Sequence, residues 1–185
     1  MLKNKNIVVG VTGGIACYKA ASVVSYLVKE GANVDVIMTK NAKEFITPLT
    51  FETLSKNKVV DDMFKKPDHT EVKHISLAQK ADLFLIVPAT ANIIGKVANG
   101  IADDMLSTTI MATKAPVIFA LAMNNNMYEN KIVQDNIERL KKYGYKFIDA
   151  EEGALACGTS AKGRLAKTKT IIDKVKETLK WVIKS

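Results

Sequence analysis

The sequence predicts an α/β fold in which a parallel sheet is covered by helices on both faces. The first observation is a set of short apolar runs, rich in β-branched residues, that have the length of strands. The second is that these runs are almost continuously apolar, as expected for strands buried on both faces. The third is that segments with helical spacing of apolar residues lie between most of them. Strands and helices that alternate in this way are typical of a doubly wound sheet.

The first two predicted strands enclose a helix. Residues 6–12 form an apolar run that leads into a pair of glycines, and residues 33–39 form the second run. Between them, residues 16–31 carry apolar side chains at helical spacing and close on Gly31, a typical helix end. The predicted unit is therefore strand, tight turn, helix and strand.

Three further strands follow, again with helical segments before or between them. The strands are expected at residues 82–88, 116–122 and 145–150, and the helices at residues 75–81, 91–113 and 129–144. The second of these helices is expected to break near Asn99 and Gly100, because this pair favours a turn.

Length and composition predict one domain over residues 1–185. This is the usual size of a single domain, and a hydrophobic content of 48% is enough for a sizeable core. The sequence does not begin with a charged and then apolar leader, and it lacks an apolar run of about eighteen residues. We therefore expect a cytoplasmic protein with no membrane association.

The net charge of +8 is concentrated near the end of the sequence. Residues 167–185 hold six lysines and two acidic residues, an excess of four positive charges that is half of the total. Apolar residues at helical spacing lie among these lysines, which predicts an amphipathic helix over residues 168–184 with a solvated basic face. Aromatic residues are not interleaved with the basic ones, so no nucleic-acid partner is expected.

The two cysteines argue against a disulfide framework and a zinc site. Neither Cys17 nor Cys157 belongs to a CxxC pair or to a Cys/His spacing typical of metal ligands, so no metal is expected. Cys157 lies in "ALACGTSAKGRL", residues 154–165. Small residues surround the cysteine, and we expect a loop outside the sheet.

Polar loops follow the first four strands, and in a doubly wound fold such loops meet at the edge where ligands bind. They read "TGGIAC", "TKNAKEF", "PATAN" and "AMNNNM". The first does not contain GxGxxG and no acidic residue ends the second strand, so NAD is disfavoured. Backbone amides at a helix N-terminus, with a hydroxyl from Thr39, suit the phosphate of a mononucleotide better. The alternative is a tight turn without a ligand.

Three other features have both a structural and a functional interpretation. A lone histidine such as His74 is more often structural than a catalytic base. Asp103 and Asp104 are explained more simply by charge compensation at a helix N-terminus than by catalysis. The asparagines of "MNNNM" shape a turn by default.

Four motifs taken together resemble the flavin-dependent cysteine decarboxylases, and among them the phosphopantothenoylcysteine decarboxylases of coenzyme A biosynthesis. They are "GGIACYK", "HIS" before "ADLFLIVPATANIIGKVANGIADDMLST", "AMNNNM" and "ACGTSAKGR". Each is weak alone, but together they follow the family's order over nearly the whole chain. The resemblance implies a Rossmann-like, flavodoxin-like fold, FMN as the cofactor and carboxy-lyase activity.

The resemblance also implies roles for individual residues. His74 matches the active-site histidine, and Cys157 matches the cysteine of a flap that covers the substrate. Substrate would be bound by Asn124, which matches the asparagine that holds the carboxylate, and by Met127, Gly163 and Arg164. FMN would be held by Gly13, Gly14, Ile15, Thr39, Thr90, Ala91, Asn92 and Ser107.

The implied reaction is oxidative decarboxylation of 4'-phosphopantothenoylcysteine to 4'-phosphopantetheine and CO2. Removal of two electrons from the CH2–S group gives a thioaldehyde β to the carboxylate, and loss of CO2 then leaves a stabilised enethiolate. His74 would be the base of the oxidative step. A thiol is protonated at neutral pH, so Cys157 would protonate the enethiolate, which must also take back hydride from the reduced flavin to give 4'-phosphopantetheine.

The sequence departs from the family pattern at two places outside the reacting groups. Leu121 stands where the family has proline, and the flap contains Ala161, Lys162 and Leu165 in place of more usual residues. Movement of the flap is therefore in question more than the chemistry. The phosphate of the substrate needs a cation near it. The candidates are Lys19, Lys162 and Arg164, and the sequence does not show which of them binds the phosphate.

The resemblance further implies homotrimers with flavin between subunits, in some members assembled into dodecamers. It also implies fusion to, or association with, phosphopantothenate–cysteine ligase. One alternative is a peptidyl-cysteine decarboxylase that acts on a precursor peptide, and the complete flap motif argues against it. The other is a non-catalytic FMN-binding regulatory protein. Such relatives carry acidic tails, whereas this sequence ends in a basic helix.

Overall fold

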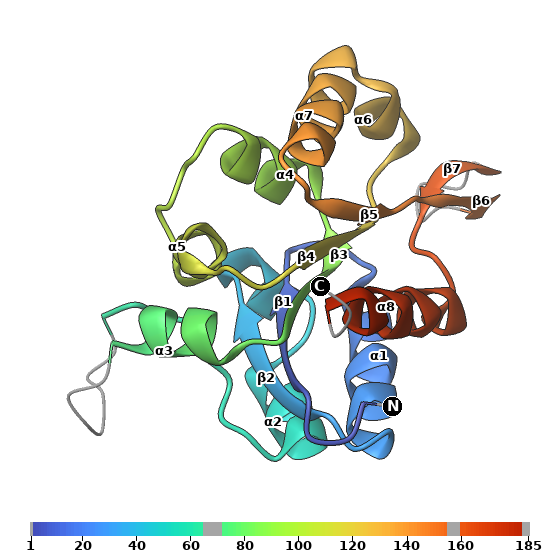
Figure 1. Cartoon of the computed structure of the whole chain (residues 1–185). Coiled ribbons are helices and arrows are strands. Elements are labelled where there is room, and N and C mark those ends of the chain that lie inside the picture. Colours follow the sequence, from blue (N-terminus) through green and yellow to red (C-terminus); the bar gives the residue numbers. More distant parts are fainter. Residues whose placement is uncertain (1, 65–71, 155–159, 183–185) are drawn as a thin grey trace.

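The structure, a computed structural model, describes residues 2–64, 72–154 and 160–182. Its centre is a parallel sheet of five strands in the order β2-β1-β3-β4-β5 (Figure 1). The strands are β1 (Asn6–Val11), β2 (Asn33–Met38), β3 (Leu83–Ala89), β4 (Val117–Leu121) and β5 (Lys146–Ile148). This order is that of a flavodoxin-like doubly wound sheet. The predicted fold class is confirmed.

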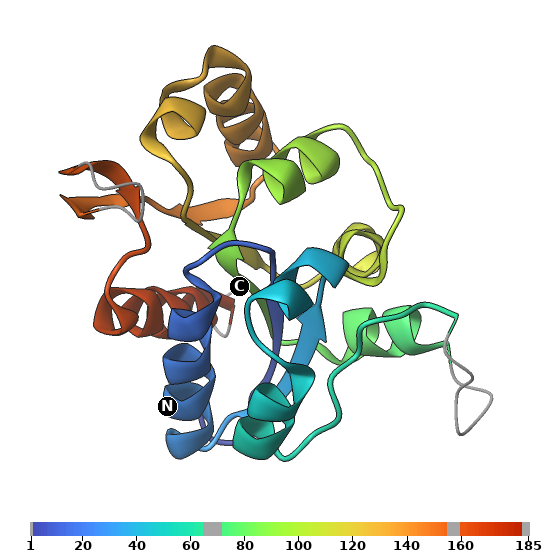
Figure 2. The same cartoon turned by 180° about the vertical axis from the view of Figure 1, so that it is seen from behind.

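Helices cover both faces of the sheet, as a parallel sheet requires. One face is covered by α1 (Cys17–Lys29), α2 (Pro48–Ser55) and α8 (Thr168–Val182). The other is covered by α3 (Lys73–Lys80), α4 (Ala91–Ala98), α5 (Met105–Ala112) and α7 (Lys131–Lys142). Figure 2 shows the same layers from behind.

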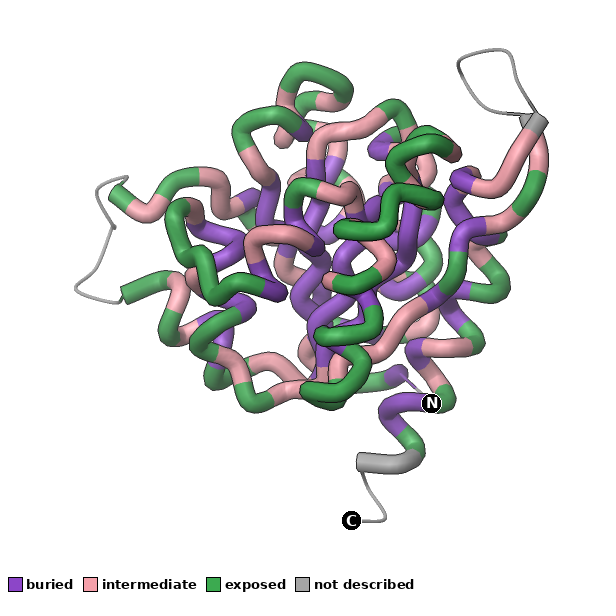
Figure 3. Tube along the Cα trace, turned by 90° about the horizontal axis from the view of Figure 1, so that it is seen from above, coloured by how far each residue is buried: buried purple, intermediate pink, exposed green. Residues whose placement is uncertain are grey.

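Successive side chains of β1 point to opposite faces of the sheet, so this strand contributes to the core on both faces. Val9 and Val11 pack with the core under α1 and α8, whereas Val8 packs with the core on the opposite face. Every residue of β3 is buried, because this strand lies in the middle of the sheet. Figure 3 shows the buried centre of the molecule, with exposed residues on the surrounding loops and helices.

The helix predicted over residues 91–113 is interrupted at the expected place. α4 ends at Ala98, Gly100 has a φ of 69°, and α5 begins at Met105. Asp104 is the N-cap of α5, and its carboxylate accepts a hydrogen bond from the N–H of Ser107 at 2.8 Å. The structural interpretation of Asp104 is thereby confirmed.

Several short elements were not expected from the sequence. They are the 3-10 helix η1 (Lys40–Glu44), α2, α6 (Asn125–Glu129), and the antiparallel strands β6 (Glu151–Ala154) and β7 (Ser160–Arg164). The expectation of a loop over residues 154–165 was therefore wrong at residue 154 and at residues 160–164. Alanine, lysine and glycine in this segment carry little strand propensity, and its extended backbone is stabilised by pairing with β6.

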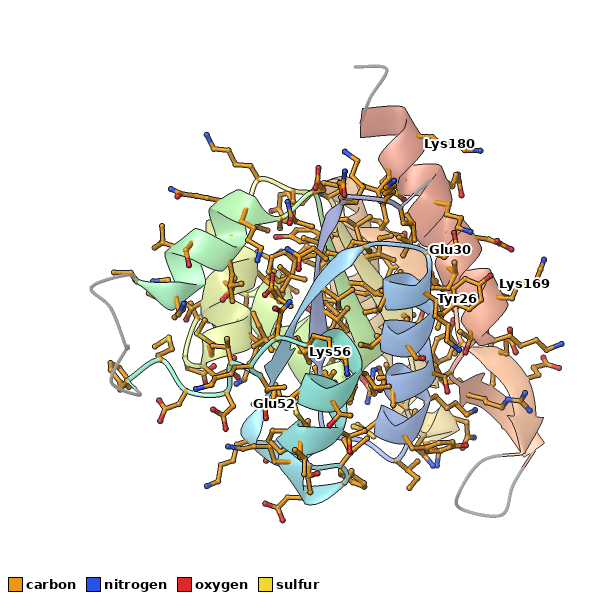
Figure 4. The ribbon with its side chains drawn as sticks, turned by 90° about the horizontal axis from the view of Figure 1, so that it is seen from below. Tyr26, Glu30, Glu52, Lys56, Lys169 and Lys180 are labelled. Atoms are coloured by element: carbon orange, nitrogen blue, oxygen red, sulfur yellow. The ribbon has the colours of Figure 1, made fainter. Side chains whose placement is uncertain are left out.

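The basic helix α8 has a solvated face beside α1. Lys176 Nζ lies 3.0 Å from the Glu30 carboxylate and 5.8 Å from the centre of the Tyr26 ring. Figure 4 shows Tyr26 and Glu30 on α1 next to α8, with Lys169 and Lys180 directed outward. Part of the positive charge of this helix is thus matched within the protein. No helix in the described part of the chain is long and apolar enough to cross a membrane.

Candidate functional site

A cavity of about 850 Å³ lies at the carboxyl ends of the strands. Its walls come from the loops after β1, β2, β3 and β4 and from strand β7. The strand order reverses between β1 and β3, and loops on the two sides of such a point diverge and leave room for a ligand. The cavity therefore lies where the fold itself favours binding.

Most residues that the sequence assigned to cofactor or substrate line this cavity. Those implied to hold FMN are Gly13, Gly14, Ile15, Thr39, Thr90 and Asn92, and those implied to bind substrate are Asn124, Met127, Gly163 and Arg164. Residues from widely separated loops thus meet at one cavity.

Three assigned residues do not line the cavity, and a fourth lies outside the described residues. Ala91 does not line it, and Ser107 is fully buried with its hydroxyl 2.9 Å from Asp104 Oδ1, in the capping box of α5. His74 is half-buried on α3, which packs beside α5 (Figure 1). Cys157 lies outside the described residues.

The two glycines after β1 have different tasks. A Cβ on Gly13 would lie 2.5 Å from the Cβ of Asn41, so this glycine lets the loop after β1 pack against η1. A Cβ on Gly14 would meet only the Thr90 Cγ2, at an ordinary 3.6 Å. Gly14 is therefore not required by packing, and its missing side chain leaves space in the cavity.

We expect alanine at these two positions to have opposite effects. Gly14→Ala should fold like the wild type but weaken FMN binding by about tenfold or more, because its methyl group occupies cavity space. Gly13→Ala should instead lower the free energy of unfolding by about 1–3 kcal/mol, because Asn41 has to move. Thermal unfolding of the apoprotein and titration of flavin fluorescence separate the two effects. Equal loss of stability in both variants would contradict this assignment.

One residue of the cavity wall, Thr12, was missed in the sequence. It follows β1 directly, as Thr39 follows β2 and Thr90 follows β3. Its Oγ1 lies 2.7 Å from the Pro88 carbonyl oxygen and 3.2 Å from the Thr90 Oγ1. Its position at a strand end was the signal that could have identified it.

An ion-pair cluster forms another part of the wall. Lys96 Nζ lies 2.7 Å from Asp103 Oδ1 and 2.8 Å from Asp104 Oδ2. Burial opposes the charge on Asp104, but hydrogen bonds from Lys96 and Ser107 hold its pKa below the ordinary value. Burial likewise opposes the charge on Lys96, but both carboxylates raise its pKa above the ordinary value. Lys96 and Asp104 are therefore both charged at neutral pH, and the charge of Lys96 is matched within the cluster.

Three other cations line the cavity without an ion pair among the described residues. They are Lys19, Lys40 and Arg164. Lys162, by contrast, does not line the cavity, and its Nζ lies 2.7 Å from Asp149 Oδ2. Of the candidates for the substrate phosphate, Lys162 is thus the least suited.

The hairpin β6–β7 reaches the cavity through Gly163 and Arg164. The N–H of Met123 donates to the Gly163 carbonyl at 3.0 Å, and a Cβ on Gly163 would clash with the Met123 carbonyl oxygen. Arg164 Nε is buried, and no described residue accepts a hydrogen bond from it. Gly153 makes room for this guanidinium, because a Cβ there would lie 2.9 Å from Arg164 Nη1. The hairpin therefore presents a cation to the cavity.

A polar bridge ties the hairpin to α6. Tyr128 on α6 donates its phenol hydrogen to Asp149 Oδ1 at 2.5 Å, while Lys162 on β7 pairs with Oδ2 and lies 5.1 Å from the Tyr128 ring centre. Burial opposes the charge on Asp149, but the hydrogen bonds from Lys162 and Tyr128 hold its pKa below the ordinary value. The carboxylate thus links two elements that border the cavity.

Asn124 stands at the start of α6. As N-cap, its Oδ1 accepts a hydrogen bond from the N–H of Asn126 at 2.9 Å, so the expected turn is confirmed. The same residue lines the cavity. Asn124 can therefore cap α6 and contact a ligand in the cavity at the same time.

The cavity suits a mononucleotide with a phosphate. α1 and α4 begin at its wall without a side-chain cap, so N–H groups of their first turns have no side-chain acceptor. Lys19 lies on α1, directly after the glycine turn, and Lys40 lies on η1, against which this turn packs, and both add positive charge to the cavity. Within the described ranges, no three His, Cys, Asp or Glu side chains gather as a metal site would require. The residues present fit a flavin nucleotide.

Comparison with known proteins gives an independent identification. The chain is 55% identical over 172 residues to the coenzyme A biosynthesis bifunctional protein CoaBC of Borreliella burgdorferi. The aligned region covers 93% of this chain and 44% of that protein. The chain thus spans less than half the length of this relative. A protein of Streptococcus mutans named "Probable phosphopantothenoylcysteine decarboxylase" is 47% identical over 177 residues, which cover 95% of this chain and 99% of the relative.

Solved structures show the same fold. The crystal structure of SpaF, named as an FMN-dependent cysteine decarboxylase, superposes with a TM-score of 0.81 at 27% identity, over 95% of this chain and 99% of SpaF. The family profile described as "Flavoprotein" matches residues 1–180, nearly the whole chain. The family's name indicates a flavin cofactor, in agreement with the cavity. The chain belongs to the flavoprotein family.

Proposed function

We propose that this protein is an FMN-dependent decarboxylase that converts 4'-phosphopantothenoylcysteine to 4'-phosphopantetheine and CO2 in coenzyme A biosynthesis. The observation that carries the proposal is one cavity in which the loops after β1, β2 and β3 meet Asn124, Met127 and the end of β7. A cofactor and a substrate can lie side by side there. Support comes from the Streptococcus mutans protein, whose name carries this activity and whose whole length the chain matches.

Bound FMN would supply the two-electron oxidation of the CH2–S group that makes loss of CO2 feasible, and it would return the two electrons afterwards, so that the product is 4'-phosphopantetheine. Asn124 would orient the substrate carboxylate by hydrogen bonding, and a neutral amide stabilises that charge less than arginine would. Cys157, outside the described residues, would protonate the enethiolate. Arg164 has unmatched positive charge in the cavity and would bind an anionic group of the substrate.

His74 would complete the site from a neighbouring subunit. It is not part of the cavity wall of its own chain, yet the family resemblance gives it the role of base. A trimer with flavin between subunits would reconcile the position of His74 outside its own cavity with the role of base. In such a trimer, α3 of one subunit would face the cavity of the next. We propose this trimer as the active unit, in the cytoplasm, with the chain folded as one domain.

The function is tested by a spectrum and by two substrates. We expect the protein, as purified or after incubation with FMN, to show the visible flavin spectrum and to bleach when phosphopantothenoylcysteine is added. It should release CO2 from this substrate at least about a hundredfold faster than from a peptide with a C-terminal cysteine, because remote contacts contribute to the rate. A protein that cannot take up FMN would overturn the proposal.

A second candidate is decarboxylation of a peptidyl cysteine. The likeness to SpaF is compatible with it, since that structure is named as a cysteine decarboxylase without a stated substrate. Its identity to this chain, 27%, is well below the 47% of the Streptococcus mutans protein. Faster turnover of the peptide in the same assay would favour this candidate. The bifunctional relatives suggest a ligase as the fused or associated partner of this chain.

A further inference from the structure

The hairpin of β6 and β7 is a two-stranded sheet of its own, separate from the central sheet (Figure 1). Glu151 is paired with Arg164, and the register then shifts. Glu152 is paired with Lys162, which leaves Gly163 as the extra residue of a β-bulge. Side chains of paired residues lie on the same face of a sheet, and successive residues of β6 point to opposite faces. Lys162 and Arg164 therefore lie on opposite faces of the hairpin.

The two faces of the hairpin have different surroundings. On one face, Arg164 lies against Gly153 and lines the cavity. On the other face, Lys162 Nζ lies 2.7 Å from Asp149 Oδ2 and 5.1 Å from the centre of the Tyr128 ring. These last three residues do not line the cavity. One face thus offers a cation to a ligand, and the other contacts the rest of the protein.

Asp149 joins three segments of the chain through one carboxylate. It lies between β5 and β6, and its Oδ2 is paired with Lys162 on β7. Its Oδ1 accepts a hydrogen bond from the Tyr128 phenol at 2.5 Å. Burial, and then the contact with Asp149, raises the pKa of Tyr128, so the phenol keeps its proton at neutral pH. The Tyr128 ring packs against the buried core, and the bridge therefore connects Lys162 to an anchored side chain.

This bridge connects two parts of the cavity wall. Tyr128 directly follows Met127, which lines the cavity from α6, and Lys162 stands two residues before Arg164, which lines it from β7. Met127 and Arg164 both belong to the residues implied to bind substrate. Their separation across the cavity therefore depends on contacts that Asp149 makes outside it.

We propose that Asp149 is a positioning residue: through Tyr128 and Lys162 it holds the β6–β7 hairpin where Arg164 can bind an anionic group of the substrate. This inference rests on the proposed decarboxylase function and gives residues outside the cavity a part in substrate binding. The Asp149 side chain is 60% exposed and that of Lys162 38%, and exposed ion pairs contribute little to global stability. Loss of the bridge should thus affect the position of the hairpin more than the folding of the chain.

The test measures KM and kcat for phosphopantothenoylcysteine, the dissociation constant of FMN and the unfolding temperature. We expect Asp149→Asn, Lys162→Met and Tyr128→Phe each to raise KM by about three- to tenfold, the effect of losing about one hydrogen bond. The change in kcat should be smaller, and FMN should bind as in the wild type. Asp149→Asn combined with Lys162→Met should be no worse than either alone, because both remove one bridge. Lys162→Arg keeps the charge and should restore the KM of the wild type.

Glu138→Gln is the matched control. Glu138 is also 60% exposed, and its Oε1 lies 2.7 Å from Lys141 Nζ on α7, outside the cavity. This variant should keep the wild-type KM, and the bridge variants should unfold at the same temperature as it does. Hydrogen exchange in the FMN-bound protein reports the position of the hairpin without turnover. The N–H of Met123, which donates to the Gly163 carbonyl, should exchange about threefold faster or more in Asp149→Asn than in the control.

The opposite results overturn the inference. If Asp149→Asn lowers KM while Lys162→Met raises it, Lys162 binds the substrate itself. If the two effects add in the double variant, or if KM and exchange match the control, Asp149 does not position the hairpin. A rise in KM that comes with loss of FMN would show a general structural role instead. If the wild type binds FMN but does not turn over the substrate, the proposed function is refuted, and exchange at Met123 still decides whether Asp149 positions the hairpin.

Discussion

Gly163→Ala is expected to lower kcat/KM by about a hundredfold or more, because displacement of a site by about 1 Å has an effect of this size. The added Cβ would clash with the Met123 carbonyl oxygen, and the φ of 154° at this position disfavours any side chain. The hairpin would have to move away from the segment that carries Asn124, taking Arg164 with it. FMN binding should be retained, because the loops after β1, β2 and β3 do not take part in this contact.

Gly144→Ala is the matched control for this prediction. Gly144 also has a positive φ, 89°, but a Cβ there would meet nothing within 4 Å, and the residue does not line the cavity. The variant should lose about 1–2 kcal/mol of unfolding free energy from backbone strain and keep wild-type kinetics. If Gly163→Ala kept kcat/KM within about threefold of the wild type, the docked position of the hairpin would be irrelevant to turnover.

A mixture of two inactive variants is expected to regain activity if His74 acts across a subunit interface. His74→Asn removes the proposed base, and Asn124→Asp places a negative charge where the substrate carboxylate should bind. The aspartate retains an oxygen for the capping bond to Asn126, so α6 should stay in place. In trimers assembled at random from equal amounts, about a quarter of the sites would combine an intact His74 with an intact Asn124.

The measurement is turnover of phosphopantothenoylcysteine by co-expressed, doubly tagged variants, compared with each variant alone. Both single variants should bind FMN, because neither residue is among those implied to hold it. If the mixture gained no activity, His74 would act within its own subunit or would not take part in the reaction. Normal turnover by His74→Asn alone would refute its role as base.

The sequence by itself determined the sheet and the place of the site. Near-continuous apolar runs separated by helical segments can only be buried as strands of a parallel sheet, and all five strands formed as predicted. Because such strands end at one edge, polar loops that are far apart in sequence were expected to meet, and Gly14, Thr39, Thr90 and Asn124 do line one cavity. The type of each residue and its position relative to a strand end were sufficient to predict that these loops meet at one cavity.

Tertiary structure alone decided how the cations and the hydroxyl groups are used. In the sequence Lys162 and Arg164 are equivalent candidates, but Asp149 neutralises the first and Gly153 makes room for the second. The Thr12 hydroxyl lies 3.2 Å from the hydroxyl of Thr90, 78 residues away. The physical reason is the same in each case: a charge or a hydroxyl is defined by its partner, and only the folded chain brings these partners within hydrogen-bonding distance.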